Sequence, residues 1–156
     1  MLKKLIHTAL GLGLVTLSIA HAETAIEIND AWVRSAPPSA KVMAGYMKIT
    51  NHGQKTISLS SINSPQFKKV EVHRSVMHDG MMHMEKIEPL SLKSHQQLVL
   101  KPGGYHLMLI KPVHAISEGD SVHLNFNFDN GDKLSLMAEV KDGEEEMGHD
   151  DKHHHH

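Results

Sequence analysis

The stretch VHLNFNFDNGDKLSLMAEV, residues 122–140, decides the fold class of this chain. Apolar and polar residues alternate through its first half, as they do in a strand with one buried face. The sequence Asp129-Asn130-Gly131-Asp132 follows, and Asn-Gly favours the backbone conformation of a tight hairpin turn. Residues 134–140 then form a second apolar run that returns along the first. The stretch therefore predicts an antiparallel β-hairpin.

Similar runs recur from residue 25 to residue 140. Turn-forming sequences such as Ser35-Ala36-Pro37-Pro38 and Pro102-Gly103-Gly104 separate them. The expected strand segments are 26–28, 31–34, 43–50, 56–62, 70–76, 81–87, 98–100 and 105–110. No ten-residue segment has a helical period, although residues 86–95 could hold a single turn. Eight or nine short strands at a spacing of about ten residues predict an all-β fold, an antiparallel sandwich of the Greek-key type.

The two ends of the chain differ from this pattern. Residues 1–22 have the features of a signal peptide: two lysines, an apolar run from 5 to 19, and the cleavage sequence Ala20-His21-Ala22. The apolar run, about fifteen residues, is short for a membrane span, so a retained anchor is the less favoured alternative. Residues 23–141 are expected to form one β-sandwich domain. Residues 142–156 are acidic and rich in histidine, which predicts a flexible tail.

The composition excludes several classes of function. The chain has no cysteine, which rules out thiol redox chemistry, cysteine-bound zinc, iron–sulfur clusters and blue copper sites. Its formal charge is −2, and its basic residues are scattered, so no nucleic-acid partner is expected. No second segment is long enough to span a membrane after cleavage. Histidine and methionine are in excess, with 15 and 10 residues beside only six aromatic ones.

Two groups of these residues are candidate metal ligands. In the expected strand 105–110, His106 and Met108 project from the same face, with Cα atoms about 7 Å apart. A second group fills residues 73–84, and its Asp79-Gly80 sequence signals a hairpin turn. That hairpin would let His73 and Met84 lie opposite each other on paired strands. The donors of the second group are His73, Met77, His78, Met81, Met82, His83 and Met84.

Imidazole nitrogen together with thioether sulfur is the ligand chemistry of Cu(I). Zinc takes thiolate, imidazole or carboxylate, and hard ions bind thioethers poorly. Isolated methionines are more often flexible core residues, and we interpret Met43, Met47 and Met137 in that way because each lies in an apolar strand. The clustered donors are hard to explain as core.

The chain resembles the PCuAC-type periplasmic copper chaperones. Their signature is histidine, ten residues, methionine, twenty-one residues, then His-x-Met, and it is matched here by His73, Met84, His106 and Met108. The resemblance extends over 30–34, 44–47, Asn51 and 100–108. It implies a cupredoxin-like fold, a periplasmic location, and a Cu(I) site built from those four residues. It also implies copper delivery toward the CuA centre of cytochrome c oxidase, with oxidase subunit II or another periplasmic copper chaperone as partner.

Other functions remain as alternatives to delivery. The chain could buffer copper, or confer resistance to it, without a specific acceptor. An enzyme is not expected, because no nucleophile or general base stands out and four ligands would leave no open position for a substrate. A secreted domain without a metal role is the remaining alternative.

The tail provides a further set of donors. Its imidazoles and carboxylates suit Cu(II), which prefers nitrogen and oxygen ligands. A purification tag is the alternative explanation of the terminal histidines. The candidate Cu(II) ligands are Met147, His149, His153, His154, His155 and His156.

Overall fold

The computed structural model of the chain describes residues 24–143, and all regular structure within this range is β. The expected signal peptide and nearly all of the expected tail lie outside the described residues. The ten strands are β1 (Ile26–Arg34), β2 (Val42–Asn51), β3 (Ile57–Asn63), β4 (Phe67–His78), β5 (Met81–Lys86), β6 (Leu90–Leu92), β7 (Gln97–Leu100), β8 (Tyr105–Pro112), β9 (Ser121–Phe128) and β10 (Lys133–Lys141).

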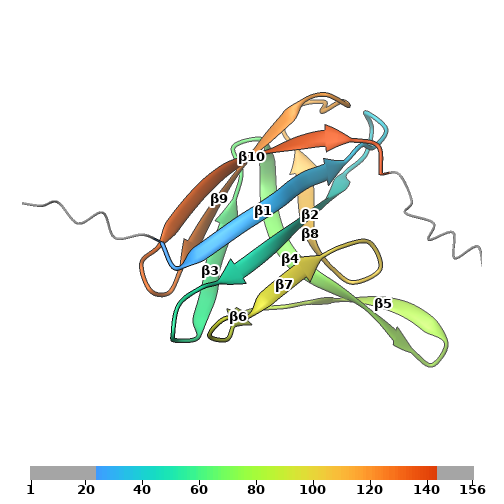
Figure 1. Cartoon of the computed structure of the whole chain (residues 1–156). Coiled ribbons are helices and arrows are strands. Elements are labelled where there is room, and N and C mark those ends of the chain that lie inside the picture. Colours follow the sequence, from blue (N-terminus) through green and yellow to red (C-terminus); the bar gives the residue numbers. More distant parts are fainter. Residues whose placement is uncertain (1–23, 144–156) are drawn as a thin grey trace, which may run out of the picture.

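The strands form one continuous sheet that curls around a single interior (Figure 1). Their order is β5-β4-β8-β7-β2-β1-β10-β9-β3-β6, so β5 and β6 are the two edges. Most neighbours are antiparallel, but β1 runs parallel to β10 and β7 runs parallel to β8. The all-β, cupredoxin-like prediction is thus confirmed, with two parallel contacts that the hairpin pattern did not indicate.

Strand positions agree with the alternation of the sequence, with two differences. The segments 26–28 and 31–34 are one strand, because a register shift between Asn29 and Trp32 keeps them paired with β2. Asp30 adopts a positive φ of 55° at that irregularity. Residues 86–95, where a helical turn was allowed, contain the three-residue strand β6, which pairs with β3.

The core is formed by the inward face of each strand. Met43 and Met47 are buried there, as expected. The expectation for Met137 is wrong: it pairs with His123 on the outward face of the β9–β10 hairpin, while the next residue, Ala138, points inward. Among the largest fully buried side chains are Phe126, Met47, Ile49, Leu92, Leu107, Leu109 and Leu124.

A close approach between β2 and β8 holds the strand with the His-x-Met sequence in place. Gly45 pairs with Leu107, and a Cβ atom at Gly45 would lie 3.1 Å from Leu109 Cδ1 and 3.3 Å from Leu107 Cβ. Glycine therefore fits at this position without strain, whereas a larger residue would require Leu107 and Leu109 to shift by a few tenths of an ångström.

The β4–β5 hairpin extends beyond the body of the sheet (Figure 1). Its turn is Asp79-Gly80, with φ of 50° and 75°, the left-handed conformation that two-residue hairpin turns require at both positions. His78 and Met81 flank the turn as a pair. The hairpin predicted from Asp79-Gly80 is therefore confirmed.

Candidate metal centre

Both histidines of the signature lie on the outward face of the sheet, on neighbouring strands. His73 of β4 pairs directly with His106 of β8, so their side chains project side by side. The two ring centroids are 6.1 Å apart, with 32° between the ring planes. A metal bonded to a ring nitrogen at about 2 Å lies about 3.1 Å from the ring centroid, so one ion held in line between two imidazoles separates the centroids by about 6.2 Å. The in-line arrangement is the widest that one ion allows, and the observed separation of 6.1 Å lies just within this limit.

Each of these rings has one nitrogen in a hydrogen bond and one nitrogen without a hydrogen-bond partner. Nε2 of His73 lies 2.8 Å from Glu71 Oε2, and Nδ1 of His106 lies 3.1 Å from the Gly104 carbonyl oxygen. Because those oxygens accept hydrogen bonds, the engaged nitrogens carry the protons in the neutral rings. The remaining atoms, His73 Nδ1 and His106 Nε2, are buried and have no hydrogen-bond partner. A buried lone pair without a donor is costly, and a bound cation would satisfy both at once.

The two methionines of the signature lie on either side of the histidine pair on the same face. Met108 is half-buried and pairs with Glu71 of β4 and Ala44 of β2. Met84 of β5 pairs with Ser75, one step beyond His73 toward the hairpin turn. The expectation that His73 and Met84 lie directly opposite is therefore wrong by two residues along each strand, because the turn register places Lys86 opposite His73. Met84 is 58 % exposed.

Glu71 is a component of the site that sequence reasoning missed. It shares the face of His73 because it lies two residues before it, which is the only sequence signal that could have indicated it. Lys69 Nζ lies 2.6 Å from Glu71 Oε1, and Lys86 Nζ lies 3.4 Å from the same atom. Hydrogen bonds from Lys69 and then from His73 lower the pKa of Glu71 from 4.5 to about 2, against the opposing effect of burial. Glu71 is therefore a carboxylate at neutral pH that can orient the His73 ring.

Aromatic residues cover the adjoining part of the same face. Trp32 of β1 pairs with Tyr46 of β2, and the ring centroids are 4.7 Å apart. Arg34 lies over the Tyr46 ring at 5.8 Å, and Lys141 lies over the Trp32 ring at 5.5 Å. Burial raises the pKa of Tyr46, so its phenol stays protonated well into alkaline solution.

The remaining sequence candidates are arranged differently. Met77 and Met82 form a pair on the face of the signature residues, nearer the hairpin turn, and His78, Met81 and His83 lie on the opposite face. The tail donors Met147, His149 and His153 to His156 lie outside the described residues. Within residues 24–143, no three histidine, aspartate or glutamate side chains gather as a metal site.

Residues 24–143 include no helix of sufficient length and apolarity to cross a bilayer.

Comparisons with known proteins agree with this fold. The family model described as LpqE-like matches residues 26–140. The uncharacterized protein RP573 of Rickettsia prowazekii is 28 % identical over 126 residues, covering 76 % of this chain and 68 % of that protein. A lipoprotein of Leifsonia xyli subsp. xyli is 23 % identical over 118 residues, covering 75 % and 70 %.

Solved structures of copper proteins share the architecture. The solution structure of Cu(I)-DR1885 from Deinococcus radiodurans has a TM-score of 0.63 and 26 % identity, covering 80 % of this chain and 83 % of that one. The copper-bound PCuAC domain from PmoF2 has a TM-score of 0.66 and 19 % identity, covering 79 % and 97 %. The fold is thus that of the PCuAC domains, and the chain belongs to the LpqE-like family.

Proposed function

We propose that this protein is a periplasmic copper chaperone that carries Cu(I) on His73, Met84, His106 and Met108. The observation that carries the proposal is the pair of buried imidazole nitrogens without partners, His73 Nδ1 and His106 Nε2, on neighbouring strands. The copper-bound structures of similar proteins support copper as the ion.

The ligand set favours Cu(I) over zinc for a physical reason. Thioether sulfur is a soft, neutral ligand that stabilises a monovalent soft ion and adds little to the binding of Zn²⁺. Two neutral imidazoles and two thioethers also leave the charge of the ion uncompensated, which is a smaller cost for a monovalent ion than for a divalent one.

The difference in exposure between the two methionines suits a carrier rather than a store. Met108 is half-buried beside Glu71 and Ala44, whereas Met84 stands largely in solvent. Release of copper would begin at Met84, since an incoming ligand from an acceptor can replace an exposed thioether without moving the sheet. We propose a non-enzymatic role for the same reason: the chemistry of the site is binding and exchange.

Copper affinity tests the ligand set. In anaerobic competition with a chromogenic Cu(I) chelator, His106→Ala and Met108→Leu should weaken Cu(I) binding strongly, and Met84→Leu should weaken it less. The matched control is Met43→Leu, a swap of similar volume on the buried face that should leave affinity unchanged. Displacement of Cu(I) from the wild type by equimolar Zn²⁺ would contradict the assignment.

Delivery is tested separately from binding. The Cu(I)-loaded protein is mixed with the soluble CuA domain of oxidase subunit II, or with a second periplasmic copper chaperone, and the copper on each protein is measured after separation. Transfer at a rate above that of free chelated copper supports delivery to cytochrome c oxidase. Retention of copper against every acceptor would favour the alternative, copper buffering or resistance.

For the C-terminal segment we propose Cu(II) capture by Met147, His149 and His153 to His156, as the donor chemistry of the sequence suggests. Deleting residues 142–156 should remove Cu(II) binding and leave Cu(I) affinity unchanged. If Cu(II) binding survives the deletion, the segment has no part in capture.

A further inference from the structure

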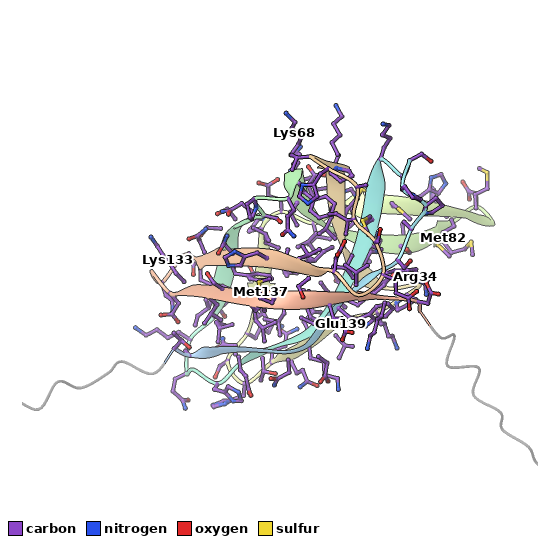
Figure 2. All side chains as sticks on the ribbon, turned by 90° about the horizontal axis from the view of Figure 1, so that it is seen from above. Arg34, Lys68, Met82, Lys133, Met137 and Glu139 are labelled. Atoms are coloured by element: carbon purple, nitrogen blue, oxygen red, sulfur yellow. The ribbon has the colours of Figure 1, made fainter. Side chains whose placement is uncertain are left out.

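The β4–β5 hairpin contains more soft donors than the proposed centre uses. The register sorts them onto two faces: Met77, Met82 and Met84 share the face of His73, and His78, Met81 and His83 share the other. Figure 2 shows Met82 on the part of the hairpin that stands away from the body, and all six residues of β5 are exposed. His78, Met81 and His83 have no role in the proposed centre.

His78, Met81 and His83 are close neighbours. His78 pairs directly with Met81, and His83 follows Met81 by two residues on the same face. The ring centroids of His78 and His83 are 6.3 Å apart, with 65° between the ring planes. This separation is close to the about 6.2 Å expected for one ion in line between two imidazoles bonded at about 2 Å. Small rotations of exposed side chains are enough to reach it.

The surrounding charges favour a cation at this place. Asp79 Oδ2 lies 3.6 Å from His78 Nε2, and Glu85 follows His83 on the same face. Arg74, a basic residue on the same face, donates to Glu85 at 3.4 Å and to the Tyr105 hydroxyl at 3.4 Å. The carboxylate of Asp79 can orient the His78 ring, as acidic residues commonly do for metal-binding histidines.

We propose that His78, Met81 and His83 form a second binding site for a soft monovalent ion, Cu(I), on the face of the hairpin opposite the His73–His106 pair. The site goes beyond the proposed function because it shares no ligand with that centre and the sheet separates the two. Met81 is 61 % exposed and the His78 side chain 79 % exposed, so the ion would exchange rapidly with solvent ligands. The site therefore binds more weakly than the buried imidazole pair.

Methyl NMR of the full-length chain with ¹³C-labelled methionine methyl groups tests the proposal, with Ag(I) as the redox-inert probe of Cu(I). After the Met108 signal has saturated, further Ag(I) should shift the Met81 methyl signal and leave Met77, on the opposite face, nearly unchanged. Met77 is a matched internal control because it is 65 % exposed on the same hairpin.

Two substitutions, each with a control variant, locate the site. His83→Ala should abolish the Met81 shift and leave the Met108 shift intact, whereas His114→Ala, a change at an exposed loop histidine, should alter neither. Because Met81→Leu removes the reporting methyl group, its effect is read from the ring signals of His83. It should weaken this Ag(I) binding at least about tenfold, equivalent to about 1.4 kcal/mol, and Met77→Leu should not.

Three results would overturn the second site. They are a Met81 signal that stays unmoved at saturating Ag(I), a Met81 shift that parallels that of Met77, and a Met81 shift that Zn²⁺ reproduces. Failure of the proposed function would appear separately, as the absence of a Met108 shift at the first equivalent.

Discussion

Replacing Glu71 by glutamine tests the electrostatic support of the metal centre. The carboxylate is 11 % exposed and contacts Lys69, His73 and Lys86. Its pKa is lowered from 4.5 to about 2. Each unit of pKa corresponds to about 1.36 kcal/mol, so the ionised group contributes at most roughly 3 kcal/mol at neutral pH, and solvent screening reduces this to about 1–3 kcal/mol.

The sign of the pH dependence follows from the direction of the shift. A carboxylate with a lowered folded-state pKa stabilises the fold fully above its unfolded value, and this contribution is lost as the pH falls from 4.5 through about 2. Glu71→Gln removes the ionisable group. The variant should therefore be less stable than the wild type at pH 7 and nearly equal to it at pH 2.

Urea unfolding of the metal-free protein measures both effects. A loss of about 1–3 kcal/mol at pH 7 moves the unfolding midpoint by about 1 M urea, since small domains lose about 1–3 kcal/mol per molar urea. Glu118→Gln is the matched control, because Glu118 is exposed and makes no ion pair within residues 24–143. A stability difference between Glu71→Gln and the wild type that is the same at pH 7 and pH 2 would refute the reasoning.

Three further predictions concern the fold around the site. Gly45→Ala should destabilise the protein by about 1–3 kcal/mol in chemical denaturation, because the new Cβ would press on Leu107 and Leu109; an unchanged midpoint would mean that β8 shifts freely. Asn51→Ala should cost about 2–4 kcal/mol, since the buried amide donates to the carbonyls of Lys55, Leu92 and Lys93, while the exposed Asn63→Ala should cost little. In an ultraviolet pH titration, burial should raise the pKa of Tyr46, so this phenol should ionise later than a tyrosine free in solution, and stability should fall as the pH rises from the ordinary tyrosine pKa to this raised value; a Tyr46→Phe variant that loses no late-ionising phenol would contradict this.

Much of the fold was predictable because strands and tight turns are local. Alternation of apolar residues located nine of the ten strands, and Asp79-Gly80 identified the projecting hairpin. β6 was missed because three residues are too few to show a period. Met137 was misassigned because its apolar character was considered without its place in the inward–outward alternation of the strand. The next residue, Ala138, holds the inward position.

The candidate site, like the fold, was predictable only in part. The sequence alone determined which donors exist and how they are spaced, since residue type decides ligand softness and spacing along a strand decides the face. Tertiary pairing decided the rest. It placed His73 against His106, brought Glu71 to the ring of His73, and set Met84 opposite Ser75, two residues from the expected position. It also divided the donors of one hairpin between two faces, because the register across a turn depends on the turn geometry and a shift of one residue exchanges the faces.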